Sequence, residues 1–210
     1  MFDPRTGSSL DGLPDRSRAP AESPAPDRPS LERAVRELVA ALRTHHRGTA
    51  EHSNRLAADC RRVGEELALE SEAVLELELV AMLHDIGKLA IPARVLDLPR
   101  RLTPRERALV RAHTVRGADI LTEVAGLEHV APLVRASHER WDGKGYPDRL
   151  AGADIPLQAR IVCTVDAYDA MTNDRPYRRA LARAEARRRI GAAAGSAFEP
   201  RIVRAVLKAL

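Results

Sequence analysis

Large apolar residues recur at intervals of three and four from Ser30 onward, the spacing that places them on one face of an α-helix. In residues 50–68 this stripe consists of Leu56, Cys60, Val63 and Leu67. No stretch shows the strict alternation of a half-buried strand. Aromatic residues make up only 3% of the chain, so the core must be built from Leu, Val, Ile and Ala, which favours helices. We therefore expect an all-α fold.

The same periodicity indicates where the helices lie. We expect them at about 31–42, 50–68, 71–83, from Thr103 through Ile120, at 128–140, from Asp154 through Asp169, and at 180–193 and 200–210. Residues 1–29 hold six of the fourteen prolines and few large apolar residues. Such a segment buries too little surface to offset its chain entropy. The sequence thus predicts a disordered tail over 1–29 and a single helical bundle domain over 30–210.

Composition excludes several classes of protein. A net charge of +4 is too small to indicate binding of duplex nucleic acid. No apolar run approaches the roughly 20 residues of a membrane span, and no apolar core of a secretory signal follows the N-terminus. Cys60 and Cys163 cannot form a disulfide framework. We expect a cytoplasmic protein without a membrane span.

Histidines and aspartates occupy positions where these helices should be apolar. Four expected helices each place one histidine on the apolar face, a fifth contributes an aspartate, and another aspartate follows one of the histidines; the set is His52, His84, Asp85, His113, His138 and Asp166. A buried, unpaired carboxylate is costly and usually needs a metal or a cation. One such residue alone is more often a hydrogen-bonded core group. Five helices with the same chemistry favour a metal centre, of a kind that suits iron, manganese, zinc or nickel.

Other polar residues give weaker signals. Lys88 follows the His84-Asp85 pair by one turn, so it can hold a phosphate near a metal or merely complement a helix C-terminus. His45, His46 and His129 lie near expected helix ends, and we expect them at the surface.

At this point the sequence resembles an HD-GYP domain, a branch of the HD phosphohydrolase superfamily, over about residues 50–205. The motifs that carry the resemblance are His52-Ser53-Asn54-Arg55, His84-Asp85-Ile86-Gly87-Lys88, His113 with Gly117, the run from His138 through Trp141 to Gly145-Tyr146-Pro147, and Asp166-Ala167-Tyr168-Asp169 leading to Arg175-Pro176-Tyr177-Arg178. A His-Asp pair alone is a weak signal, whereas all five motifs in this order form a strong one.

The resemblance implies a bacterial enzyme that hydrolyses cyclic di-GMP with divalent metal ions, iron or manganese. It implies the ligands His52, His84, Asp85, His113, His138 and Asp166, with Asp85 bridging two ions and a hydroxide between the ions as nucleophile. It also implies that Asp85 and Lys88 take part in catalysis. Arg175 and Arg178 would hold the phosphates of the nucleotide, and Gly145, Tyr146 and Pro147 would shape the substrate side.

Two positions depart from the family pattern. Ser137 stands where the family has a histidine that is a metal ligand, and Gly48 stands where some relatives have a carboxylate for a third metal. We therefore expect a centre of two ions, with a single ion as the alternative. Two other functions stay open: a catalytically weakened adaptor or nucleotide sensor with the same fold, and an HD hydrolase of another phosphoester. We expect regulation, where it exists, from a protein partner or a homodimer.

Charge and aromatic residues are unevenly distributed along the chain. Residues 174–210 hold ten Arg or Lys and three Asp or Glu, a net of +7, whereas residues 1–173 sum to −3. Four of the six aromatic residues, Trp141, Tyr146, Tyr168 and Tyr177, lie in the part that resembles the substrate side. These distributions favour a small phosphate-bearing ligand whose bases stack on aromatic rings.

Overall fold

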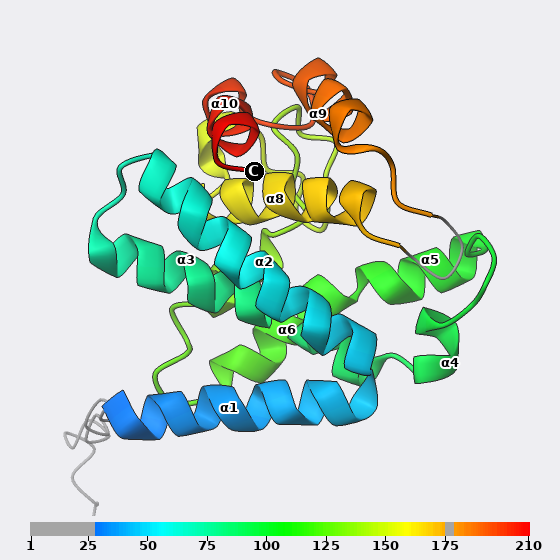
Figure 1. The fold of residues 1–210 in the computed structure, drawn as a ribbon. Coiled ribbons are helices and arrows are strands. Elements are labelled where there is room, and N and C mark those ends of the chain that lie inside the picture. The colour runs from blue at the N-terminus through cyan, green and yellow to red at the C-terminus, as the bar shows by residue number, and fades with distance from the viewer. Residues whose placement is uncertain (1–27, 175–178) are drawn as a thin grey trace, which may run out of the picture.

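The computed structural model describes residues 28–174 and 179–210, and in these ranges the chain is helical (Figure 1). The elements are α1 (Arg28–His45), α2 (Arg47–Glu66), α3 (Ser71–Leu83), η1 (Ile86–Ala90), α4 (Ala93–Leu96), α5 (Pro104–Arg111), α6 (His113–Thr122), α7 (Ala131–Arg135), η2 (Gly152–Asp154), α8 (Leu157–Thr172), α9 (Arg183–Ala192) and α10 (Pro200–Ala209). Within these ranges a single bridge, between Ala194 and Phe198, is the only β-type pairing. The predicted all-α fold is confirmed.

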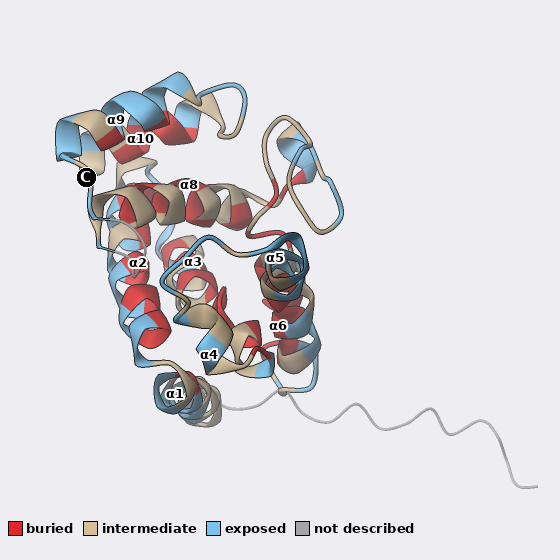
Figure 2. Ribbon diagram, turned by 90° about the vertical axis from the view of Figure 1, so that its right-hand side faces the viewer, coloured by how far each residue is buried: buried red, intermediate tan, exposed pale blue. Residues whose placement is uncertain are grey.

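Helix α2 runs from α1 at one end of the bundle toward α10 at the other (Figure 1). It packs against α3 most extensively and also contacts α1, α8 and α10, while α6 packs against η1 and α7. The longer helices such as α2, α3 and α8 bury one side in the interior, whereas α4 and α5 have no buried residues (Figure 2). The core is almost entirely aliphatic, with Leu56, Leu77 and Ile161 among its fully buried residues. Packing of the apolar stripes therefore fixes the bundle, as the periodicity indicates.

Two expected helices differ from the structure. The helix expected from Thr103 through Ile120 is two helices, α5 and α6, that meet at Ala112. At this break the His113 ring uses Nδ1 to contact the carbonyl of Val110 at 2.7 Å, an oxygen that a continuous helix would bond to a backbone N–H. The helix expected at 128–140 is reduced to α7, which begins beside Pro132 and ends before His138.

Two other expectations fall partly or wholly outside the described residues. The predicted tail at 1–29 lies almost entirely there, as do Arg175, Tyr177 and Arg178. Among the described helices, none is long and apolar enough to cross a membrane.

Candidate metal centre

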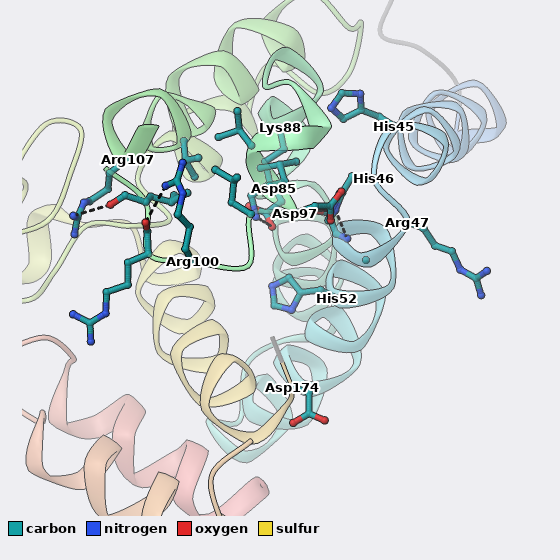
Figure 3. Close-up of a pocket in the computed structure, with 18 of the residues that line it drawn as sticks. His45, His46, Arg47, His52, Asp85, Lys88, Asp97, Arg100, Arg107 and Asp174 are labelled. Atoms are coloured by element: carbon teal, nitrogen blue, oxygen red, sulfur yellow. Dashed lines mark hydrogen bonds and ion pairs between the residues drawn. The ribbon is translucent and has the colours of Figure 1, made fainter. Parts of the chain in front are cut away.

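The six residues predicted as metal ligands come from separate elements and meet beside η1. His52 lies on α2, His84 caps the C-terminus of α3, Asp85 precedes η1, His113 begins α6, His138 follows α7, and Asp166 lies on α8. Four of them are nearly inaccessible, with 1–3% of the residue exposed for His52, His84, Asp85 and His113. Figure 3 shows His52, Asp85 and Lys88 around one pocket.

Asp85 belongs to two groups of ligand atoms. The first consists of His52, His84 and Asp85, and the second of Asp85, His113 and His138; within each group the donor atoms lie within 4.8 Å of one another. Oδ2 of Asp85 is 3.4 Å from Nε2 of His84, and Oδ1 is 3.4 Å from Nε2 of His113. The two oxygens of one carboxylate thus face two different imidazoles, the geometry that a bridging carboxylate needs.

Backbone carbonyls orient two of these imidazoles. Nδ1 of His84 contacts the carbonyl oxygen of Ala81 at 2.7 Å, and Nδ1 of His113 contacts that of Val110 at the same distance. Because a carbonyl oxygen can only accept, each contact places the proton on Nδ1 and leaves the unprotonated Nε2 able to bind a metal ion. Nε2 of His113 is buried and has no hydrogen-bond partner. Such an orphaned atom fits a site that is completed by a metal ion.

His52 is held between two carboxylates of α8. Its Nδ1 lies 2.7 Å from Oδ2 of Asp169, and its Nε2 lies 3.1 Å from Oδ1 of Asp166. Asp169 is 2% exposed, and its other oxygen accepts a hydrogen bond from Asn173 Nδ2 at 2.8 Å. Asp166 therefore lies directly beside His52, although it belongs to neither three-donor group.

Asp169 is part of one of the sequence motifs, but the sequence alone predicts no function for it. It orients His52 as a second carboxylate behind a metal-ligating imidazole would. The available signal was its spacing of three from Asp166, which puts both side chains on the same face of α8.

The electrostatics of the centre follow from this burial. Burial opposes a charge on His52, but its hydrogen bonds to Asp166 and Asp169 raise the pKa of the ring to about 9. Burial and the neighbouring His113 lower the pKa of His138 to about 3. Burial alone would raise the pKa of Asp85, but the surrounding His84, Lys88 and His113 hold it well below its ordinary value. Asp85 is therefore ionised, as a metal ligand must be.

Lys88 reaches the same carboxylate. Its Nζ donates to Oδ2 of Asp85 at 2.6 Å, and 18% of its side chain is exposed. The ammonium therefore lies beside the donor groups with one side open to the pocket. This position fits a contact with an anionic ligand better than a role at a helix C-terminus.

Gly87 allows η1 to approach α6 closely enough to build the centre. A Cβ at this position would lie 1.9 Å from the carbonyl oxygen of His113 and 2.4 Å from the backbone nitrogen of Gly117. These contacts are to backbone, which cannot swing aside. Any larger residue would push Asp85 away from His113.

The loop with Gly145, Tyr146 and Pro147 covers one side of the centre. The Tyr146 ring stacks on His138, with centroids 5.2 Å apart and planes 6° apart, and Arg111 lies over a face of the same tyrosine ring at 4.8 Å. A Cβ on Gly145 would lie 2.4 Å from the backbone nitrogen of Arg140, so this turn also requires glycine.

Buried Glu139 anchors the far end of this loop. Its Oε1 accepts from the backbone N–H groups of Asp148 at 2.7 Å and of Arg149 at 2.9 Å. One carboxylate thereby fixes the segment that follows Tyr146.

The predictions for three further histidines and for Tyr168 are partly confirmed and partly wrong. His129 is exposed, as predicted. His45 and His46 are half-buried, so the surface prediction for them is wrong: His45 contacts the carbonyl of Ile91, and His46 accepts from Thr49 N and so caps α2. Tyr168 is 5% exposed and belongs to the core, so its hydroxyphenyl ring is not available for base stacking.

The two positions that depart from the family pattern hold no donor atoms of the centre. Ser137 is 1% exposed, and its hydroxyl has no hydrogen-bond partner. It belongs to neither three-donor group. Gly48 is exposed at the edge of the neighbouring pocket.

Two cavities meet at this centre. The smaller, about 430 Å³, is lined by His52, Asp85, Lys88, Val110, His113, His138, Tyr146, Asp166, Ala170 and Met171. The larger, about 860 Å³, shares four of these residues and extends along α4 and α5. The buried donor groups therefore adjoin two cavities, which meet at His52, Asp85, Lys88 and Val110.

A family model described as "HD domain" matches residues 35–202 of the chain. Among curated proteins, a cyclic di-GMP phosphodiesterase of Thermotoga maritima is 38% identical over 162 residues, covering 76% of this chain and 44% of that protein. The cyclic di-GMP phosphodiesterase response regulator RpfG of Xanthomonas campestris is 38% identical over 173 residues, covering 81% and 46%. A 3'3'-cGAMP-specific phosphodiesterase 2 of Vibrio cholerae is 36% identical over 184 residues, covering 86% and 35%.

Solved structures show the same fold. A cyclic GMP-AMP specific phosphodiesterase of V. cholerae, V-cGAP3, has a TM-score of 0.62 at 24% identity, covering 85% of this chain and 48% of that one. The HD domain of the L. monocytogenes phosphodiesterase PgpH in complex with cyclic-di-AMP has a TM-score of 0.63 at 19% identity, covering 82% and 92%. The chain spans less than half the length of the three curated relatives.

Proposed function

Because the chain belongs to the HD domain family, we propose that it is a metal-dependent phosphodiesterase that hydrolyses cyclic di-GMP. The observation that carries the proposal is the pair of three-donor groups that share Asp85. The names of the relatives in Thermotoga and Xanthomonas support cyclic di-GMP as the substrate.

The donor set fits two divalent ions, which we propose to be iron or manganese. His52, His84 and Asp85 would hold one, with Asp166 beside them, and Asp85, His113 and His138 would hold the other. Imidazole and carboxylate together suit these metals. When bound, the ions would supply Lewis acidity toward the phosphodiester and generate a nucleophile from water near neutral pH.

The surrounding residues would bind and orient the substrate. Lys88, already beside Asp85, would contact the phosphate that reacts. Arg175 and Arg178, which lie outside the described residues, would hold phosphate oxygens through their forked donors. Gly145, Tyr146 and Pro147 would close the side of the site next to His138.

One experiment tests the proposal directly. Protein purified without oxygen and loaded with iron or manganese is assayed for metal content and for cleavage of cyclic di-GMP. We expect about two ions per chain and hydrolysis, and we expect Asp85→Ala to lose both while its helical circular dichroism is retained. Stoichiometric metal in Asp85→Ala would contradict the assignment of the site, and intact cyclic di-GMP with the fully loaded wild type would contradict the function.

Ser137 favours a second candidate, an adaptor or nucleotide sensor with little catalysis. Its buried hydroxyl contributes no donor to either group, so the second ion would have only Asp85, His113 and His138. Ser137→His discriminates between the two functions. If wild-type protein binds but does not cleave cyclic di-GMP, and the variant cleaves it, the protein acts as an adaptor or nucleotide sensor.

The same assay decides the nature of the substrate. Three V. cholerae relatives are named for 3'3'-cGAMP, so cyclic GMP-AMP and linear dinucleotides belong in the panel beside cyclic di-GMP. A higher kcat/KM for one of these would identify the protein as an HD hydrolase of another phosphoester.

A further inference from the structure

The larger cavity is a groove that runs from the candidate metal centre to the segment between α4 and α5 (Figure 3). It shares His52, Asp85, Lys88 and Val110 with the smaller cavity, so the two spaces are continuous at the donor atoms. Its volume, about 860 Å³, lies in the range of small-molecule binding sites, roughly 300–1,000 Å³. Of the substrate-binding residues expected from the sequence, Gly145, Tyr146 and Pro147 do not line this groove.

One wall of the groove combines an apolar surface with cations. The apolar part comes from Val95, Leu96, Leu98, Leu102 and Val110. The cations are Arg100, Arg101 and Arg107, all exposed. Figure 3 shows Arg100 and Arg107 on the opposite side of the pocket from His46 and Arg47, with His52 between the two sides. An apolar floor with a few convergent polar groups is the usual composition of a ligand site.

These three arginines differ in how many of their guanidinium N–H groups remain available to bind a ligand. Arg100 is engaged, because both of its terminal nitrogens lie 2.8 Å from the carboxylate of Glu106. Arg107 uses one nitrogen on the carbonyl of Leu102 at 3.2 Å, which leaves most of its five donors available. Within the described ranges the guanidinium of Arg101 makes no hydrogen bond or ion pair, although its backbone carbonyl accepts from Arg100. Arg101 and Arg107 are therefore the cations on this wall that can receive an anion.

The groove also contains acidic residues, and their positions restrict where an anion can lie. Asp85 is neutralised by Lys88, and Asp97 lies 2.9 Å from His46 on the opposite wall. Asp174 lines the edge below His52 (Figure 3). The charged residues that α4, α5 and their connection contribute to the groove are all cations except Asp97. An anionic group is therefore favoured on the side of Arg101 and Arg107.

We propose that this groove binds the half of a cyclic dinucleotide that does not react, with Arg101 and Arg107 on its phosphate and base. The inference rests on the proposed function, because it concerns the same site. A cyclic dinucleotide has two phosphates on opposite sides of its ring, so when one lies at the donor groups, the other must lie in an adjoining space. Forked guanidinium donors match a phosphate, and the planar groups can also stack on a base.

Two substrates separate this role from a general structural effect. Cyclic di-GMP would occupy both the metal centre and the groove, whereas bis(p-nitrophenyl) phosphate has one phosphate and needs only the metal centre. For Arg101→Ala and Arg107→Ala we expect KM for cyclic di-GMP to rise about 5- to 20-fold each. For the small substrate we expect kcat/KM to stay within about twofold of wild type.

Matched controls come from α4 and α5, the two helices that flank Arg101. Arg94 on α4 and Arg105 on α5 are exposed arginines that do not line the groove, so Arg94→Ala and Arg105→Ala remove the same charge a short distance away. We expect both controls to behave as wild type on both substrates. If the controls weaken cyclic di-GMP as much as the groove variants, or if both substrates suffer equally in the groove variants, the inference is wrong.

Direct binding keeps the test independent of catalysis. Affinity of the wild type and all four variants for a fluorescently labelled cyclic di-GMP is measured without added metal. Wild-type binding that is weakened only by Arg101→Ala and Arg107→Ala supports the groove even if no cleavage is seen, in which case the proposed function alone fails. Absence of wild-type binding, or equal affinity in all variants, overturns the inference.

Discussion

Replacing Asp169 with asparagine tests whether His52 is a metal ligand oriented by a second carboxylate. The substitution keeps the size of the side chain but removes the charged carboxylate whose Oδ2 accepts a hydrogen bond from Nδ1 of His52 at 2.7 Å. The other oxygen of Asp169 accepts from Asn173 Nδ2 at 2.8 Å. An asparagine cannot satisfy both neighbours, because its carbonyl can face only one of the two donors. If its amide N–H₂ faces His52, the ring must carry its proton on Nε2, the atom that should bind the metal.

The expected magnitude follows from this geometry. Both partners are buried, with His52 3% and Asp169 2% exposed, so the charge-assisted hydrogen bond is not screened by solvent. A hydrogen bond to a charged group contributes about 1.5–3 kcal/mol. Loss of the second carboxylate behind a ligating histidine typically lowers metal affinity by about 10- to 100-fold, or about 1.4–2.7 kcal/mol. The two estimates agree, so we expect Asp169→Asn to weaken manganese binding at the site that includes His52 by this factor.

Competition between the protein and a coloured chelator for Mn²⁺ measures this affinity. Asp154→Asn is the matched control, because Asp154 is an exposed carboxylate just before α8, and its loss should leave the affinity unchanged. Circular dichroism should show the same helical content in both variants. An Asp169→Asn protein that keeps its fold and binds Mn²⁺ within twofold of wild type would refute the role of Asp169.

Three further predictions concern the approach of η1 to α6, the charge of His52 and the anchoring of the loop. Gly87→Ala should lower the melting temperature and abolish metal binding, because the new Cβ meets the backbone of α6 at 1.9 Å; Gly191→Ala on α9, whose Cβ would have its nearest neighbour at 4.0 Å, should leave both intact or raise the melting temperature slightly. In EDTA, the free energy of unfolding should fall by about 3 kcal/mol between pH 6.5 and 9, because a His52 pKa raised from 6.5 to about 9 stabilises the fold fully below pH 6.5 and not above pH 9. Urea titrations at several pH values should show a smaller fall in His52→Asn. If the free energy of unfolding depends on pH equally in both proteins, the assignment is contradicted. Glu139→Ala should increase proteolysis of the loop around residues 145–149, whereas Glu139→Gln, which retains the acceptor, should resemble wild type; equal cleavage of both variants would show that Glu139 does not anchor the loop.

Local sequence patterns account for most of the helices and for the donor set. The apolar periodicity places α2 and α3 within a few residues of their observed bounds, and Thr103 forms the capping box with Glu106 that its sequence suggests. The six predicted ligands are brought to one place because the helices that carry them bury their apolar faces together. A polar residue within an apolar stripe can be identified from the sequence alone, and it indicates a candidate ligand without knowledge of the tertiary structure.

The features that escaped the sequence depend on contacts between distant segments. The break at Ala112 coincides with a contact between the His113 ring and the carbonyl of Val110, which the helical periodicity does not indicate. His46 looks like a solvated residue at a helix end, yet it caps α2 and contacts Asp97, which is 51 residues away. Asp166 and Asp169 are equivalent in the pattern, and only the distances to the two nitrogens of His52 separate their roles. Neither propensity nor periodicity contains such distances.

The count of donors at the centre bears on whether Ser137 prevents catalysis. Each of the two groups retains three donor atoms without any contribution from Ser137. Three protein ligands with one open position is the arrangement of catalytic zinc sites, whereas structural sites are fully closed by four. A histidine at position 137 would add a donor and tighten the second site, but it would also fill a place that water or substrate oxygen needs. Ser137→His is therefore expected to raise metal affinity in either case, and only its effect on kcat separates an open catalytic centre from one that has lost its function.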